Sequence, residues 1–234
     1  MRVPKEVTDR AKEGKPPPAS GFLGGELKNG WIVLMRPVED FLIARRIHPN
    51  VLTVTSLVVS ALAGLLFYNG WTFLGGVVLL AGSTFDMLDG RVARAQGLAT
   101  PRGAFFDSTL DRVAEVLVFL GLLGYFRDGL FLYVVFLLVA ASTMVSYTRA
   151  RAEGLGIRCD IGMMQRPERI VYLGVAAVFN PFGNFVARAA LGVGVEDLVL
   201  KGALLLILLF SAATAVQRTL HVMRALDSDG AKRR

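Results

Sequence analysis

The sequence predicts an all-α, polytopic membrane protein with six transmembrane helices and an amphipathic surface helix ahead of the first span. Of its 234 residues, 53% are hydrophobic, and its mean hydropathy is +0.52. Several apolar stretches approach the roughly 20 residues that a helix needs to cross a bilayer. These stretches are continuous, whereas the strands of a membrane barrel alternate apolar and polar residues. A soluble domain of this length does not need so many long apolar runs, so the soluble class and the membrane-barrel class are both disfavoured.

The first residues of the chain are polar and rich in proline. We expect 1–21 to form a flexible polar tail. It lacks the apolar core of a cleavable signal peptide, so we do not expect one there. In 22–47 apolar residues recur at helical spacing among charged ones, which predicts an amphipathic juxtamembrane helix on the membrane surface. Packing of this helix against the protein itself is the alternative. The apolar residues are Leu27, Trp31, Leu34, Met35, Val38, Leu42 and Ile43.

Turn signals separate the six spans that we expect within a membrane domain covering 48–226. Asn50 is expected to cap the first span. The segment 180–184 contains a proline and a glycine, and we expect it to break the fifth span, with a loop or re-entrant segment up to Asp197. The expected spans are about 51–68, 71–86, 103–125, 130–150, 167–179 and 198–220, followed by a basic C-terminal tail at 227–234.

Basic residues are distributed unevenly around these spans. Of the 26 Lys and Arg residues, only Arg127, Arg188 and Lys201 fall on the side opposite the two termini. Because basic residues concentrate on the cytoplasmic side, this bias predicts a multi-pass cell-membrane protein with both termini cytoplasmic. The net charge of +7 then reflects topology and anionic lipid head groups rather than nucleic acid. The single cysteine, Cys159, reads as an ordinary loop thiol.

Four aspartates stand at the ends of two neighbouring spans. Asp86 and Asp89 are three residues apart, and Asp107 and Asp111 are four apart, so each pair shares one face of its helix. An unpaired charge at membrane depth is costly, which makes these residues functional candidates. If the two faces meet, the four carboxylates repel one another unless a cation lies between them. Oxygen-only ligands favour Mg²⁺ or Mn²⁺.

Two glycines and an arginine accompany the aspartates. Gly90 follows Asp89 directly and lets a ligand approach the helix closely, and Gly103 could do the same on the second helix. Arg94 lies one turn beyond Gly90 and can meet a phosphate with its guanidinium group. Solvated charges at helix ends are the alternative, but they explain one or two aspartates rather than the whole set.

The pattern D-x-x-D-G-x-x-A-R-x8-G-x3-D-x3-D, which runs from Asp86 to Asp111, resembles the signature of the CDP-alcohol phosphatidyltransferases. The resemblance implies a helical membrane fold with six spans, usually a homodimer, that moves a phosphatidyl group from CDP-diacylglycerol to an alcohol and releases CMP. It also implies that all four aspartates bind Mg²⁺ or Mn²⁺, in a two-metal site, and that Asp111 is the catalytic base.

The same resemblance places the nucleotide. CDP would lie against Gly90 and Gly103, with Arg94 near its diphosphate. The short run that contains Asn50 and Thr53 also resembles a family motif, which implies that these two residues contact the nucleotide or support the carboxylates. An ordinary helix start at these positions is the alternative.

A second polar cluster bears on the alcohol. Arginines gather at 146–153, 166–169 and 217–218, on the same side as the aspartates. Cations at a helix start oppose the helix dipole unless an anion is bound there, so this cluster favours an acceptor with its own phosphate. The alternative is that these arginines only follow the positive-inside rule and snorkel to the interface.

The stretches Ser-Tyr-x-x-Ala-Arg-Ala-Glu and Arg-Pro-Glu-Arg are similar to those of prokaryotic phosphatidylinositol phosphate synthases, which use inositol 1-phosphate. This similarity implies that Ser146, Arg149, Arg166 and Arg218 bind the acceptor phosphate. A phosphatidylglycerol phosphate synthase that uses glycerol 3-phosphate is the first alternative, and a non-enzymatic carrier of divalent cations is a distant one. The sequence leaves open the exact acceptor and whether the donor lipid is an ester or an ether.

Overall fold

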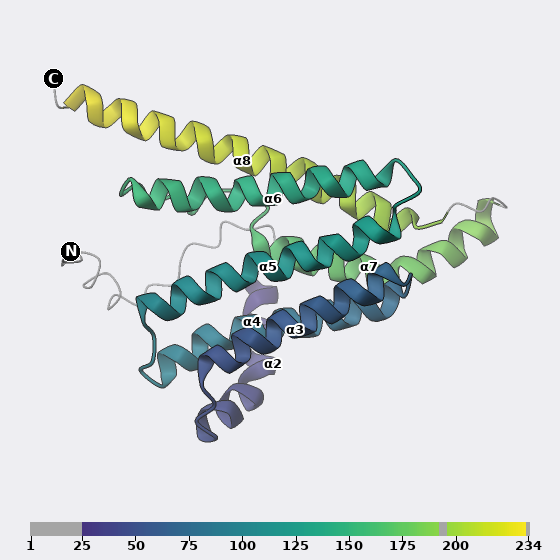
Figure 1. The fold of residues 1–234 in the computed structure, drawn as a ribbon, viewed down its shortest axis with the longest axis horizontal. Coiled ribbons are helices and arrows are strands. Elements are labelled where there is room, and N and C mark those ends of the chain that lie inside the picture. The colour runs from purple at the N-terminus through teal and green to yellow at the C-terminus, as the bar shows by residue number, and fades with distance from the viewer. Residues whose placement is uncertain (1–24, 192–195, 233–234) are drawn as a thin grey trace.

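In the computed structural model, which describes residues 25–191 and 196–232, the chain forms seven helices (Figure 1). No strand occurs within these residues, so the all-α prediction is confirmed for them. The expected tail at 1–21 lies outside the described residues. The helices are α2 (Gly25–Ala44), α3 (Pro49–Tyr68), α4 (Thr72–Ala95), α5 (Pro101–Tyr125), α6 (Phe131–Gly154), α7 (Arg166–Leu191) and α8 (Leu198–Lys232).

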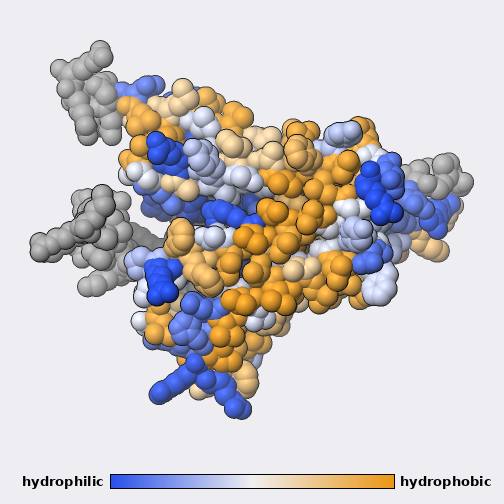
Figure 2. All heavy atoms as spheres, in the orientation of Figure 1, coloured by the Kyte–Doolittle hydropathy of each residue, from blue (hydrophilic) through white to orange (hydrophobic). Residues whose placement is uncertain are grey.

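Five of the described helices are long and apolar enough to cross a membrane: α3, α4, α6, α7 and α8. The remaining long helix of the bundle, α5, has the length for a crossing but carries charged residues along it, including Asp107, Asp111 and Glu115. Figure 2 shows hydrophobic residues over the middle of one face and hydrophilic residues toward its ends. This distribution is typical of a bundle whose flank contacts lipid.

The helix starts are set by residues that cap them. His48 is the N-cap of α3, where its Nδ1 accepts a hydrogen bond from the backbone N–H of Asn50 at 3.2 Å. The prediction that Asn50 itself is the cap was therefore wrong, because the helix begins at Pro49, which suits a first helical position. Thr100 caps α5 by accepting from the N–H of Gly103 at 3.1 Å.

The predicted break at 180–184 was wrong, because α7 continues to Leu191. The side-chain amide of Asn180 donates to Asp197 at 2.7 Å and its carbonyl accepts from the N–H of Leu200 at 3.2 Å. The side chain of Asn184 accepts from the N–H of Asp197 at 2.8 Å. These polar residues therefore tie α7 to the start of α8 instead of ending the helix. A proline inside a helix removes one backbone hydrogen bond, which these contacts offset.

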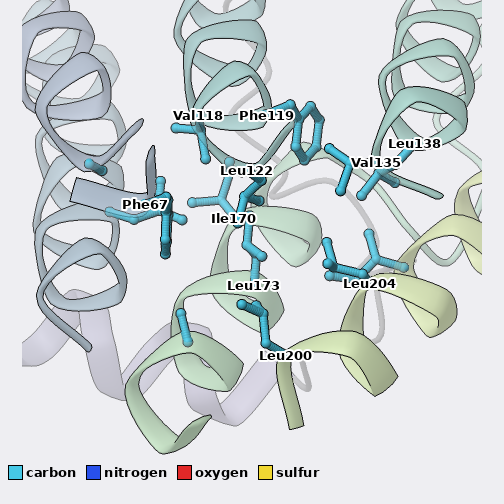
Figure 3. Close-up of a cluster of buried hydrophobic side chains, with 14 of the residues drawn as sticks. Phe67, Val118, Phe119, Leu122, Val135, Leu138, Ile170, Leu173, Leu200 and Leu204 are labelled. Atoms are coloured by element: carbon cyan, nitrogen blue, oxygen red, sulfur yellow. The ribbon is translucent and has the colours of Figure 1, made fainter. Parts of the chain in front are cut away.

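A buried apolar cluster joins six helices, α3 to α8, at the centre of the bundle (Figure 3). Leu122 of α5 and Leu173 of α7 lie within it, each 1% exposed or less. Glycines bring the helix backbones together: a Cβ added to Gly121 would overlap the carbonyl of Gly64, which holds α5 against α3. A Cβ added to Gly76 would lie 2.7 Å from the carbonyl oxygen of Gly174, which holds α4 against α7. Because α3 also packs against α4, both aspartate-bearing helices are brought into one bundle.

The helix expected at 22–47 is present as α2, and it packs on α4. Glu39 forms an ion pair with Arg91 at 2.7 Å, and Gln96 donates to the carbonyl of Ile47 at 3.2 Å. Other apolar side chains of α2 are exposed, Leu34 by 62%. That the exposed side meets the membrane surface stays a prediction. At the other end of the chain, α8 continues to Lys232, so 227–232 of the expected basic tail extend the last helix, and 233 and 234 lie outside the described residues.

Candidate active site

The carboxylates of Asp86, Asp89 and Asp107 converge where α4 ends and α5 begins. One oxygen from each lies within 4.8 Å of the others. Asp111 is linked to this group through Arg166, whose Nη1 lies 2.6 Å from Asp86 Oδ2 and 2.9 Å from Asp111 Oδ2. The spacing of the aspartates along two helices therefore predicted a cluster that the fold assembles, although the motif did not reveal the arginine within it.

The burial of the cluster shows what it can hold. Asp89 is only 4% exposed. The Oδ1 atoms of Asp86 and Asp107 are buried and make no hydrogen bond within the described part of the chain. Buried carboxylate oxygens normally find a partner, so this pair of oxygens fits a cation. The donor set contains oxygen alone, which suits Mg²⁺ or Mn²⁺.

Thr53 supports one of these carboxylates from the neighbouring helix α3. Its hydroxyl group donates a hydrogen bond to Asp89 Oδ2 at 2.7 Å, and Thr53 is 4% exposed. The contact joins Thr53 to the carboxylate cluster, and its role in supporting the site stays a prediction. Asn50 is exposed at the start of the same helix, beside a groove of about 460 Å³ that is lined otherwise by Val51, Val54, Thr55 and Val58.

The two glycines of the motif leave their helix backbones open. A Cβ added to Gly90 would meet only the guanidinium of Arg94, at 3.5 Å, and one added to Gly103 would meet only the hydroxyl of Thr100, at 3.3 Å. Arg94 is itself exposed and lies over Gly90. A ligand can therefore approach the backbone at both glycines, and at Gly90 the guanidinium of Arg94 lies beside it.

The expected acceptor residues are placed differently from one another. Arg166 joins the aspartate cluster, while Arg149 lies at the exposed end of α6 and pairs with Glu153 at 2.9 Å and Asp160 at 3.3 Å. Ser146 is partly exposed on α6. No contact recorded among the described residues joins these three side chains, so their common role stays a prediction.

Arg218 is 2% exposed and holds backbone rather than an open surface. Its Nε donates to the carbonyl of Ile161 at 2.8 Å, and its Nη1 donates to the carbonyl of Val145 at 2.7 Å. It thereby holds the connection between α6 and α7 against Val145, the residue before Ser146. Cys159 in this connection is also buried, and burial raises the pKa of its thiol, which disfavours the reactive thiolate.

Sequence reasoning missed the ion pair between Glu115 and Arg169. Two hydrogen bonds join them, Arg169 Nε to Glu115 Oε1 at 2.6 Å and Arg169 Nη2 to Glu115 Oε2 at 3.0 Å. The signal was available, because Glu115 continues the row of Asp107 and Asp111 at four-residue spacing.

Comparison with known proteins gives a consistent result. Residues 46–216 match the family described as CDP-alcohol phosphatidyltransferase. The phosphatidylinositol phosphate synthase of Streptomyces avermitilis is 30% identical over 224 residues, 93% of this chain and 89% of that protein. The enzyme of the same name from Mycobacteroides abscessus is 37% identical over 166 residues, 69% of this chain and 74% of that one. The archaetidylinositol phosphate synthase of Pyrococcus horikoshii is 40% identical over 136 residues, 57% of this chain and 71% of that protein.

Solved structures show the same likeness. The phosphatidylinositol phosphate synthase of Mycobacterium tuberculosis with CDP-DAG bound has a TM-score of 0.68 at 32% identity, covering 80% of this chain and 92% of that one. The structure of that enzyme in complex with manganese and citrate has a TM-score of 0.69 at 31% identity, covering 80% and 88%. Together with the assembled aspartates and the open glycines, these matches show that the chain belongs to the CDP-alcohol phosphatidyltransferase family.

Proposed function

We propose that this enzyme transfers a phosphatidyl group from CDP-diacylglycerol, or an ether-lipid analogue, to inositol 1-phosphate and releases CMP. The observation that carries the proposal is the convergence of Asp86, Asp89 and Asp107 beside an arginine that also contacts Asp111. The names of the relatives support the inositol phosphate acceptor. Because one relative is an archaetidylinositol phosphate synthase, ester and ether lipids are both candidate donors.

Mg²⁺ or Mn²⁺ would be held by Asp86, Asp89, Asp107 and Asp111, as a two-metal site. When bound, such ions neutralise the diphosphate and stabilise the charge that develops on the leaving CMP. The unpartnered buried oxygens of Asp86 and Asp107 support this assignment. The manganese in the mycobacterial structure supports it independently.

The chain's own residues would orient the donor. Thr53 fixes the direction of Asp89 through its hydrogen bond. The open backbones at Gly90 and Gly103 admit the nucleotide, and Arg94 is close enough to Gly90 to contact the diphosphate of that nucleotide. Asn50, exposed at the start of α3, is proposed as a further nucleotide contact.

Asp111 is proposed as the general base. It would accept the proton of the acceptor hydroxyl, whose oxygen then attacks the lipid-side phosphorus while the bond from that phosphorus to CMP breaks. Arg166, Arg149 and Ser146 would bind the acceptor's own phosphate, which offers about −1.5 to −2 charges and three acceptor oxygens. Arg218 would contribute by holding the backbone of Val145 beside Ser146.

We also propose six spans, with α5 as the additional one, both termini in the cytoplasm of the cell, and a homodimer. The length of α5 and its place in the central apolar cluster support its crossing the membrane. The bias of basic residues supports the orientation. The homodimer rests on the family resemblance.

Turnover of CDP-diacylglycerol against a panel of acceptors tests the proposal. With Mg²⁺ or Mn²⁺ present, we expect inositol 1-phosphate to be used, and free inositol and glycerol 3-phosphate to react poorly. Use of glycerol 3-phosphate alone would replace the acceptor and leave the chemistry intact. Equal use of free inositol would refute a phosphate-binding role for the arginines. Binding of CMP or CDP distinguishes the enzyme from a cation carrier, which has no use for a nucleotide site.

A further inference from the structure

The ion pair between Glu115 of α5 and Arg169 of α7 is the most deeply buried one among the described residues. The side chain of Arg169 is 1% exposed and that of Glu115 is 5% exposed. Both oxygens of the carboxylate receive a hydrogen bond, at 2.6 and 3.0 Å, so the two planar groups meet as a fork. Such a bidentate pair fixes direction as well as distance.

The guanidinium of Arg169 also holds the segment that leads into α7. Its Nη1 donates to the carbonyl of Met164 at 3.2 Å. The N–H of Met164 in turn donates to the hydroxyl of Thr214 on α8, also at 3.2 Å. Met164 stands two residues before Arg166, the first residue of α7. Arg169 therefore ties the start of α7 to α5, and Met164 ties it to α8.

The buried pair runs parallel to the arginine contact in the active site. Glu115 lies one helical turn beyond Asp111 on α5, and Arg169 lies about one turn beyond Arg166 on α7. The outer link, Arg166 to Asp111 at 2.9 Å, is 19% exposed on each side chain. The inner link is almost closed to water. The pair of Glu115 and Arg169 thus sets the separation and relative rotation of α5 and α7 next to Asp111 and Arg166.

Stability alone does not explain a charged pair at this depth. Burying two charges has a large desolvation cost, and well-packed apolar residues often replace such a pair without loss of stability. Apolar side chains of these same helices, such as Val118 and Ile170, already pack together in the adjoining apolar cluster (Figure 3). What the fork adds is a fixed geometry between α5 and α7.

We propose that Glu115 and Arg169 are positioning residues that aim Arg166 at the acceptor phosphate. The pair touches no reacting atom and acts through Arg166, so the inference rests on the proposed role of Arg166 in acceptor recognition. A displacement of about 1 Å in a group that binds the reacting partner can cost about 10²-fold in rate. Loss of the fork should therefore weaken use of the acceptor while leaving the donor site intact.

The test removes both charges together in Glu115→Gln/Arg169→Met, because a single replacement would leave a buried charge unpaired. We expect this variant to fold, with its melting temperature close to that of the native enzyme. Its KM for inositol 1-phosphate should rise about tenfold or more, and its KM for CDP-diacylglycerol should change little. Asp197→Asn, at the far end of the bundle, is the control: it should lower the melting temperature without changing the acceptor KM.

A mutant cycle with Arg166→Gln then identifies the route of the effect. If the pair acts through Arg166, this replacement raises the acceptor KM strongly in the native background and little in the background without the pair. Equal effects in both backgrounds would overturn the positioning role and leave the proposed function standing. If Arg166→Gln leaves the acceptor KM unchanged in the native enzyme, the acceptor assignment fails, and the positioning role fails with it.

Arg169→Lys provides a second variant that keeps the buried charge. Lysine has no fork, so it cannot bond both oxygens of Glu115 and the carbonyl of Met164 in the same directions. We expect a rise in the acceptor KM with an unchanged KM for CDP-diacylglycerol. A native acceptor KM in this variant would overturn the proposal, because it would show that charge without geometry is sufficient.

Discussion

The four aspartates of the motif are held by different neighbours, which suggests that their roles in the site differ. Asp89 is buried and receives the hydroxyl hydrogen bond of Thr53. Asp111 is less buried and pairs with Arg166. A carboxylate whose direction is fixed by a neighbour suits metal ligation. Asp111 shares Arg166 with Asp86, so its proposed role as the base rests on the family resemblance rather than on this contact.

We expect Asp111→Asn to abolish turnover while binding of CDP-diacylglycerol is largely retained. The amide cannot accept the proton of the acceptor, yet Asp86, Asp89 and Asp107 still converge. Turnover and donor binding are measured on the same preparation. Asp89→Asn is the comparison, and it should weaken binding of Mn²⁺ itself. Near-native turnover by Asp111→Asn would exclude this residue as the base.

Thr53→Val tests the supporting contact, because valine has nearly the same shape and no hydroxyl group. The loss should weaken Mn²⁺ binding about 10–100-fold, as is typical when a group that orients a metal ligand is removed. Thr55→Val is the matched control, since the Thr55 hydroxyl donates to the carbonyl of Val51 in its own helix. Titration with Mn²⁺ compares the three proteins, and equal affinities would contradict the role of Thr53.

The spacing of the aspartates predicted which carboxylates share a face, because that depends only on helix geometry. It could not predict the groups that hold them. Thr53 and Asp89 are 36 residues apart, Glu115 and Arg169 are 54 apart, and Asp86 and Arg166 are 80 apart. Such partners depend on which helices become neighbours, and hydrophobic periodicity alone does not specify this.

The end of α7 shows a second limit of sequence reasoning. A proline and a glycine within 180–184 favoured a break, since both residues are unfavourable inside a helix. The structure continues the helix because Asn180 and Asn184 bond the start of α8, and the phenol of Tyr125 donates to Asp197 at 2.8 Å. Tertiary hydrogen bonds, which the sequence pattern does not predict, override the helix-breaking preference of the proline and the glycine.

Asn180→Ala should therefore destabilise the bundle without affecting catalysis. It removes the amide that bonds Asp197, which is 7% exposed, and leaves the N–H of Leu200 without its acceptor. Unsatisfied buried polar groups cost about 1–3 kcal/mol each. Thermal unfolding in detergent measures the loss, and Asn69→Ala, at an exposed helix end, should change it little. An acceptor KM altered by Asn180→Ala would show that the two ends of the bundle are coupled.

The order of the helices places all the active-site chemistry at one end of the bundle. α4 ends and α5 begins at the aspartates, α6 ends near Arg149, and α7 begins at Arg166 (Figure 1). The network around Asp197 occupies the opposite end, where α7 ends and α8 begins. Charged residues at both interfaces thus leave an apolar flank between them, as a bilayer requires.

Removal of divalent cations should abolish turnover and leave the fold intact. EDTA should eliminate activity, and Mg²⁺ or Mn²⁺ should restore it, because without a divalent cation the four carboxylates repel the diphosphate of the donor. The helical content should not change, since Arg166 compensates part of the carboxylate charge through Asp86 and Asp111 without any metal. Circular dichroism and turnover are measured together. Undiminished activity in EDTA would contradict the metal site.

Orientation in the membrane is tested by labelling from outside intact cells. An even number of spans places both ends of the chain on one side, and the bias of basic residues makes that side cytoplasmic. In a Cys159→Ser background, Gly129→Cys should react with an impermeant thiol reagent, and Ser228→Cys should not. Both positions are exposed, so a lack of reaction reports topology rather than burial. Labelling of position 228 alone from outside would reverse the orientation, and labelling of both positions would require an even number of spans between them.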